Sequence, residues 1–171
     1  MTTSTDQNST DSQLKTVGWR EWLELPDLGI PHIKAKIDTG AQTSSLHATE
    51  VETFDRDGCT CVRFTTVPLQ NDPHTVQCEA ELRGLRSVRS SDGQSSQRPV
   101  IVTTIQLFGE SHRVEVTLAD RTRMGFPMLL GRTALEDRFL VHAGRSFLSG
   151  IPEEFNGMST RDEPEDACDT D

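Results

Sequence analysis

The sequence predicts an all-β fold, most simply a small closed β-barrel with one short helix near its C-terminal end. Two observations favour this fold class. Apolar and polar residues alternate along much of the chain, as they do in strands with one buried face, and turn-forming pairs rich in Gly, Asp, Asn and Pro separate the alternating segments. About eight short strands in about 130 residues suit a barrel, because closure removes exposed strand edges.

The clearest strand runs through residues 32–37 and ends at Asp38. Isoleucine and alanine occupy one face of this segment, and histidine and lysine occupy the other. The same alternation predicts further strands around Val62 and Phe64, from Ile101 to Leu107, and from Val114 to Leu118. The Gly109-Glu110 turn is predicted to join the last two strands as a hairpin. The one helix is predicted over residues 133–137.

The folded domain is predicted to span residues 17–150. Residues 1–16 and 151–171 contain too few large apolar side chains to offset the entropy of ordering, so we expect a disordered N-terminal segment and an acidic disordered tail. Inside the domain, residues 83–99 are polar and rich in serine and arginine, which predicts a long loop or a projecting hairpin.

Charge and composition argue against several functions. The net charge is −10, but most of the excess acid falls in residues 151–171, and the body of the chain is nearly neutral. No nucleic acid is expected as a partner, because such a surface needs clustered lysine and arginine. No apolar run approaches the roughly 18 residues of a membrane span, and the first residues lack the features of a signal peptide. We therefore expect a cytoplasmic protein that contacts no membrane, with free cysteine thiols.

Two short motifs carry the functional signal. In the first, Asp38-Thr39-Gly40-Ala41 follows the clearest strand, so a carboxylate at a strand end enters a tight turn in which backbone N–H groups can hold it. In the second, the apolar run Leu129-Leu130-Gly131 leads into the short helix. Each motif alone is common, and their order in one all-β chain is what makes them informative.

Together the motifs resemble those of the retropepsin-like aspartic peptidases. Ile37-Asp38-Thr39-Gly40-Ala41 is similar to the loop that supplies the catalytic aspartate, and Leu129-Leu130-Gly131-Arg132 is similar to the strand that packs beneath that loop. Over residues 17–149 the chain also resembles the bacterial retropepsin-like family often labelled ATP-dependent zinc protease. The segments that carry this second resemblance are 18–22, 38–48, 86–91, 98–101 and 124–135. The resemblance implies a barrel of retropepsin type and aspartic endopeptidase activity.

An aspartic peptidase needs two carboxyl groups about 3 Å apart that share one proton. One acts as general base on a water, and the other polarises the scissile carbonyl. Because the chain contains the Asp-Thr-Gly triplet once, we expect a homodimer in which two copies of Asp38 meet on the two-fold axis. The resemblance implies that Thr39 braces the opposite loop, that Gly40 and Ala41 support the turn, and that no cofactor is needed.

The expected substrate is a peptide or protein, and Arg86 and Arg89 of the 83–99 segment are the candidate substrate contacts. Guanidinium groups bind carboxylates in forked pairs. The resemblance also implies association with ATP-grasp ligases that add glutamates to the C-terminus of a ribosomal protein. We therefore hypothesise that the enzyme trims glutamate-rich tails, so that the target of a glutamate ligase is its partner.

Two other functions stay open at this point. A domain of the same fold could bind peptides without catalysis, since fold alone does not establish activity. A zinc-dependent hydrolase would need thiolate and imidazole ligands, for which Cys59, Cys61, His74 and Cys78 are the candidates. Their spacing matches no common ligand pattern, so no metal site is predicted. His47 is interpreted as a local hydrogen-bonding residue.

Overall fold

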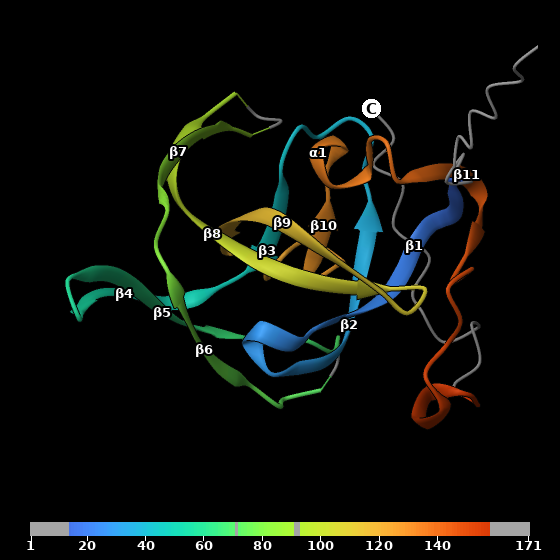
Figure 1. The fold of residues 1–171 in the computed structure, drawn as a ribbon, viewed down its shortest axis with the longest axis horizontal. Helices are drawn as coiled ribbons and strands as arrows, with labels where there is room; N and C mark the ends of the chain where they lie inside the picture. Colours follow the sequence, from blue (N-terminus) through green and yellow to red (C-terminus); the bar gives the residue numbers. More distant parts are fainter. Residues whose placement is uncertain (1–13, 71, 91–92, 158–171) are drawn as a thin grey trace, which may run out of the picture.

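The computed structural model describes residues 14–70, 72–90 and 93–157, which are folded mainly into strands (Figure 1). The all-β prediction is confirmed. In chain order the elements are β1 (Lys15–Leu25), η1 (Pro26–Leu28), β2 (Ile30–Ile37), β3 (Ser44–His47), β4 (Thr49–Arg56), β5 (Cys59–Thr66), β6 (Val76–Glu81), β7 (Gly84–Arg89), β8 (Ser95–Leu107), β9 (Glu110–Ala119), β10 (Met128–Leu130), α1 (Arg132–Leu135), β11 (Phe139–Ser146) and η2 (Glu153–Phe155).

The strands form a large ring-like sheet and a small second sheet. Eight strands follow the order β11-β1-β2-β10-β3-β9-β8-β7, and β4, β5 and β6 pair separately. A further pairing between β1 and β8, at Glu24 and Gln106, turns the large sheet back on itself (Figure 1). This contact makes the sheet ring-like, while a fully closed barrel stays a prediction.

The apolar side chains of the alternating segments are buried in the core. Along β2 the buried side chains are Ile30, Ile33, Ala35 and Ile37, while the residues between them are exposed or half-buried. Each large apolar side chain buried in this way contributes roughly 1.5–3 kcal/mol to folding. The core cluster also takes in Val62, Phe64 and Cys78 from the small sheet, so that sheet is anchored on the ring by its apolar face.

The structure has eleven described strands rather than about eight. β4 is not predicted from the sequence, and β7 is predicted only as part of a long loop or projecting hairpin. Neither strand contains a buried residue, so no alternation of buried and exposed positions marks them in the sequence. The helix spans Arg132–Leu135 rather than 133–137, because the chain leaves helical geometry at Glu136 and Asp137 then adopts a positive φ of 62°. Residues 84–89 and 95–100 pair as the outer part of the β7–β8 hairpin, in agreement with the predicted projecting hairpin.

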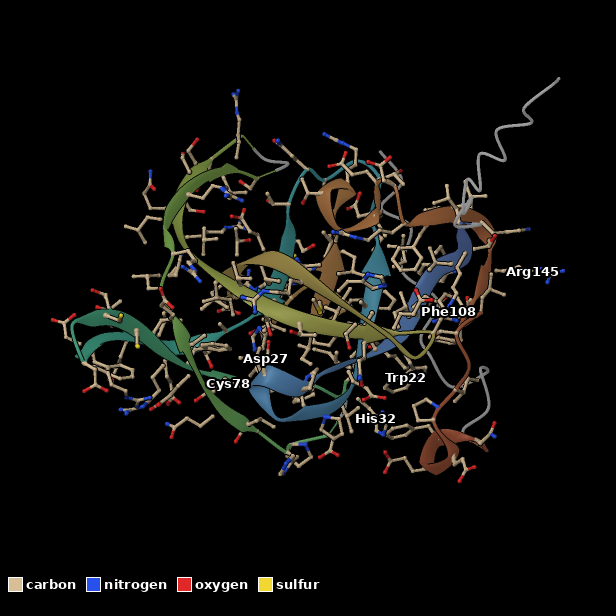
Figure 2. All side chains as sticks on the ribbon, in the orientation of Figure 1. Trp22, Asp27, His32, Cys78, Phe108 and Arg145 are labelled. Carbon is tan, nitrogen blue, oxygen red and sulfur yellow. The ribbon has the colours of Figure 1, made fainter. Side chains whose placement is uncertain are left out.

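The folded part extends past both predicted domain boundaries. Lys15 and Thr16 pair with β11, so β1 begins inside the segment predicted to be disordered. At the other end, η2 folds back beside Trp22 and His32, which are labelled in Figure 2. The Phe155 ring stacks on Trp22 with centroids 4.7 Å apart, and Glu154 lies 2.6 Å from His32 Nε2. These contacts order residues that composition alone assigned to a tail, whereas residues 1–13 and 158–171 lie outside the described residues.

A buried carboxylate, that of Glu21 in β1, holds the segment that follows β11. Glu21 has no exposed surface. Its Oε1 accepts hydrogen bonds from the N–H of Gly18 at 2.6 Å and of Leu148 at 3.0 Å. Its Oε2 accepts hydrogen bonds from the N–H of Ser149 at 3.0 Å and from the Ser149 hydroxyl at 2.7 Å. Four donors therefore satisfy this carboxylate inside the protein.

None of the helices among the described residues is long and apolar enough to cross a membrane.

Candidate active site

Asp38 is the first residue after β2, and backbone pairing fixes its position. β10 pairs with β2 in parallel, with Leu130 opposite Ile37. The N–H of Asp38 then donates a hydrogen bond to the carbonyl of Leu130 at 2.9 Å. The two sequence motifs, far apart in the chain, thus meet through their backbones at the start of the Asp-Thr-Gly turn.

The turn holds one oxygen of the Asp38 carboxylate and leaves the other available. Oδ1 accepts hydrogen bonds from the N–H of Gly40 at 2.9 Å and of Ala41 at 3.1 Å. Oδ2 makes no hydrogen bond to a described residue, and the Asp38 side chain is only half-buried. A carboxylate oriented in this way can take part in acid–base chemistry without first breaking a contact inside the protein.

Gly131 lies directly beneath the turn. A Cβ atom at this position would lie 2.6 Å from the carbonyl carbon of Thr43 and 3.0 Å from the carbonyl oxygen of Ala41. Only glycine allows the two backbones to approach so closely. Its N–H donates to the buried Ser44 hydroxyl at 3.2 Å. The loop and the entry to α1 are therefore packed as one unit.

Arg132 and the second motif support the loop from below. The Nη1 of Arg132 donates to the carbonyl oxygens of Thr39 and Gly40, each at 3.0 Å, and its N–H donates to the carbonyl of Ala41 at 2.8 Å. Leu130 is fully buried and Leu129 half-buried. The structure thus brings together Asp38, Thr39, Gly40, Ala41, Leu129, Leu130 and Gly131, all of which the sequence had singled out. It also shows that Arg132, the last residue of the second motif, supports the loop directly.

The arginines of the β7–β8 hairpin are arranged differently from one another. Arg86 and Arg98 lie directly opposite across the two strands, a like-charge pair that is unfavourable on its own. Glu115 offsets it in part, at 2.7 Å from Arg86 Nη2. Arg89 is exposed near the hairpin turn, where its Nε donates to the carbonyl of Gly93 at 3.3 Å. Of the two predicted substrate contacts, Arg86 is thus already ion-paired.

Arg121, which the sequence analysis did not single out, lies in the loop that precedes β10, the strand whose Leu130 carbonyl accepts the N–H of Asp38. Its side chain is almost buried, and its Nε donates to the carbonyl of Phe126 at 3.1 Å. Burial, and then the positive charge of Arg98, lower its pKa, while the negative charge of Asp38 acts in the opposite direction. The available signal was the presence of arginines in the loop just before the second motif, but the sequence does not reveal that one of them is buried.

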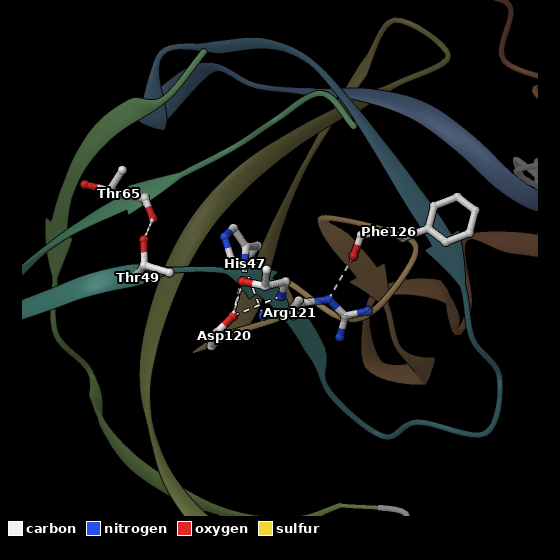
Figure 3. A network of polar contacts seen from close by, with 7 residues as sticks. His47, Thr49, Thr65, Asp120, Arg121 and Phe126 are labelled. Atoms are coloured by element: carbon white, nitrogen blue, oxygen red, sulfur yellow. Dashed lines mark hydrogen bonds and ion pairs between the residues drawn. The ribbon is translucent and has the colours of Figure 1, made fainter. Parts of the chain in front are cut away.

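His47 positions Arg121, as shown in Figure 3. Its Nδ1 accepts the backbone N–H of Arg121 at 3.0 Å, which assigns the proton of the neutral ring to Nε2. Burial lowers the pKa of His47, Asp120 at 3.8 Å opposes that shift, and Arg121 adds to it. His47 is thus a local hydrogen-bonding residue, as interpreted from the sequence.

The four zinc-ligand candidates do not gather in the structure. Cys59 is exposed on β5, whereas Cys78 is buried on β6 with its Sγ 3.6 Å from the carbonyl of Leu28. Burial raises the pKa of the Cys78 thiol to about 11, which disfavours a thiolate ligand. Within the described ranges, no group of three or more His, Cys, Asp and Glu side chains could hold a metal ion. These residues therefore do not fit a zinc centre.

Comparison with protein families gives one match that covers most of the chain. The RimB-like family model, described as retropepsin-like aspartic endopeptidase RimB, matches residues 16–152. A solved structure from Legionella pneumophila, of a protein with unknown function, superposes with a TM-score of 0.67 at 31% identity, over 79% of this chain and 98% of that one.

Curated relatives carry a different name. A probable alpha-L-glutamate ligase from Shewanella pealeana is 43% identical over 135 residues, and one from Desulfotalea psychrophila is 44% identical over 134 residues. These alignments cover 78% of this chain but only 30% and 29% of the relatives. The chain therefore spans less than a third of the proteins that bear the ligase name.

Proposed function

The chain belongs to the RimB-like family of retropepsin-like aspartic endopeptidases, and on that premise we propose that it hydrolyses peptide bonds with a pair of Asp38 carboxyl groups from two copies of the chain. The observation that carries this proposal is the state of Asp38. The turn fixes Oδ1 with two backbone N–H groups, and Oδ2 has no hydrogen bond to a described residue.

In the proposed mechanism the two carboxyl groups face each other across the two-fold axis and share one proton. The ionised carboxyl takes a proton from a water, which attacks the peptide carbonyl carbon. The protonated carboxyl donates a hydrogen bond to the carbonyl oxygen, where negative charge develops. The proton is then passed to the amine that leaves. The fixed turn contributes by holding each carboxyl in one orientation.

The dimer can be tested together with the chemistry. Wild type and Asp38→Asn are unfolded together in equal amounts, refolded so that subunits exchange, and assayed for peptide cleavage. If each site needs two Asp38 residues, only wild-type homodimers work, and activity per total chain falls to about a quarter of wild type. Independent monomers would retain about a half. Solution mass measured on the same samples shows whether a dimer forms, and a monomer that cleaves at full rate would contradict the proposal.

The proposed substrate is a glutamate-rich tail. Support comes from the arginines of the β7–β8 hairpin: Arg86 and Arg98 lie opposite each other, Glu115 is the one acidic partner that Arg86 has among the described residues, and Arg89 is exposed. Relatives of this chain bear the name of a glutamate ligase, and a glutamate ligase makes a product of this chemistry. The ligase name itself describes proteins more than three times as long as the matched segment, so we assign it no catalytic meaning for this domain.

Mass spectrometry of a glutamate-extended peptide tests the substrate. We expect wild type to shorten the tail and Asp38→Asn to leave it intact. Charge reversal of Arg86 and Arg89 is expected to raise KM about tenfold for this peptide, while KM for a glutamine-extended control changes little. Equal effects on both peptides would contradict acidic specificity. Binding of the glutamate peptide by wild type without cleavage would identify a non-catalytic peptide-binding module instead.

A further inference from the structure

Arg121 has an unusual environment for an arginine. Only 8% of its surface is exposed, yet it has no ion pair with any described acidic residue. Its one side-chain hydrogen bond among the described residues is that from Nε to the carbonyl of Phe126. Buried cations in folded proteins are normally paired, because removing a charge from water costs several kcal/mol. The terminal nitrogens of Arg121 have no hydrogen bond to a described residue, and they are not among the fully buried side-chain atoms without a partner, so they remain accessible to an anionic ligand.

The loop that carries Arg121 is held firmly. The backbone N–H of Arg121 donates to His47 Nδ1, and its Nε donates to Phe126, so both ends of the residue are fixed (Figure 3). The Phe126 ring in turn makes an edge-to-face contact with Trp19, with centroids 5.8 Å apart. A guanidinium held in one place binds a ligand with little further loss of conformational entropy.

Arg121 also links Asp38 to a cleft. The cleft has a volume of about 550 Å³ and lies between the loop of residues 121–127, the end of β3 and the segment after β5. Apolar side chains such as Leu69, Met124 and Pro127 line it together with Arg121 and His47. The Nε of Arg121 donates to the carbonyl of Phe126, the short strand β10 follows, and the carbonyl of Leu130 at its end accepts the N–H of Asp38. The four residue steps from Phe126 to Leu130 span roughly 13 Å. An extended peptide bound at Asp38 covers that distance in a few residues, so it could place one of its side chains in this cleft.

We propose that Arg121 is a specificity-determining residue that binds a side-chain carboxylate of the substrate a few residues from the scissile bond. The assignment rests on the proposed function, since it assumes that a peptide lies along Asp38. The two terminal nitrogens form a forked pair with both carboxylate oxygens, a geometry that arginine provides and lysine does not. Arg86 is less suited to this role because its guanidinium group is already paired with Glu115.

Binding measured without turnover tests this assignment. In the Asp38→Asn background, fluorescence anisotropy with a labelled hexaglutamate peptide and a matched hexaglutamine peptide compares Arg121→Met, Arg121→Lys and the parent. We expect Arg121→Met to bind hexaglutamate about 10- to 100-fold more weakly, with little change for hexaglutamine. Arg121→Lys should fall between. Arg145→Met, which removes the same charge from the exposed strand β11 (Figure 2), is the control and should bind like the parent.

A thermal melt separates recognition from a structural role. Replacing an unpaired buried charge by an apolar side chain of similar size is often neutral, so Arg121→Met should change Tm by no more than about 3 °C. A large fall in Tm in both Arg121 variants, or loss of the dimer, would assign Arg121 to stability and overturn the proposal.

The outcomes also separate this inference from the proposed function. If Arg121→Met cleaves and binds hexaglutamate like wild type, the inference is wrong and the peptidase remains. If wild type binds hexaglutamate through Arg121 but never cleaves it, the inference holds and the peptidase is wrong. If the parent does not prefer hexaglutamate to hexaglutamine, the inference is overturned.

Discussion

Glu21 lies in β1, Asp38 directly follows β2, the strand that pairs with β1, and the environments of these two carboxylates are opposite. Glu21 in β1 has no exposed surface, and both of its oxygens accept hydrogen bonds, four in all. Asp38 at the end of β2 is half-buried, and only Oδ1 accepts hydrogen bonds, from two backbone N–H groups. A carboxylate with every acceptor site used stabilises the fold, whereas one that is fixed but incompletely bonded is available for chemistry.

The largest effect is expected from Asp38→Asn on activity. The amide keeps an oxygen that can accept the bonds from Gly40 and Ala41 but cannot act as a base, so kcat/KM should fall at least about 10³-fold. Initial rates of peptide cleavage measure this loss, and a melt should show a Tm close to that of wild type. Cleavage at the wild-type rate would remove Asp38 from the mechanism.

Glu21→Gln should give the reverse pattern. The amide nitrogen of glutamine would face N–H donors, so that hydrogen bonds to a buried acceptor are lost and the free energy of unfolding should drop by roughly 2–4 kcal/mol. Chemical denaturation measures the drop. Activity per folded molecule at low temperature should be nearly unchanged. If Glu21→Gln lost activity while keeping its stability, the contrast between the two carboxylates would fail.

Gly131→Ala tests whether the support beneath Asp38 matters by itself. The added methyl would clash with backbone atoms of Thr43 and Ala41, which can be displaced only by moving the loop. We therefore expect the free energy of unfolding to fall by about 1–3 kcal/mol. Displacement of the loop should also reduce kcat/KM by about tenfold or more. Gly157→Ala is the matched control, because a Cβ there meets nothing within 4 Å. Wild-type values for Gly131→Ala would show that the loop does not depend on this contact.

The smallest effect is expected from pH at His47. Its pKa in the folded protein lies below the ordinary value of 6.5, chiefly through burial, with Asp120 opposing and Arg121 adding to the shift. The unfolded chain therefore takes up the proton first, so stability should be full above about pH 6.5 and decline as pH falls toward the lowered pKa. Melts between about pH 8 and pH 5 should show a steeper decline for wild type than for His47→Gln, by no more than about 3 °C. If Tm declined with pH equally in wild type and His47→Gln, His47 would not be the source of the pH dependence.

The sequence predicts the regions whose signals are local. The strand that ends at Asp38 alternates apolar and polar residues over its whole length, and the turn that follows is encoded by its own residues. The small helix is also near its predicted place, although it ends early because the chain leaves helical geometry at Glu136, before the positive φ of Asp137. β4 and β7 have no buried side chain, so hydrophobic patterning carries no information about them.

Other features depend on contacts between distant parts of the chain, which a single sequence does not reveal. Arg121 is buried because the loop of residues 121–127 packs against His47 and Trp19, and composition alone would assign an arginine in a loop to the surface. The order of residues 153–155 likewise depends on Trp22 and His32, more than a hundred residues earlier in the chain. The satisfied state of Glu21 and the incomplete state of Asp38 could be distinguished only once their donors were located.

The close approach of Gly131 to the backbone of residues 41–43 has a consequence for how this protein can evolve. Neither stretch can change in sequence independently, since a larger residue at position 131 would require a different backbone conformation in the loop above it. Across many descendants the two stretches should therefore be inherited together or altered together. A lineage that gave up catalysis would be released from this restriction, and a bulkier residue at position 131 would be an early mark of that loss.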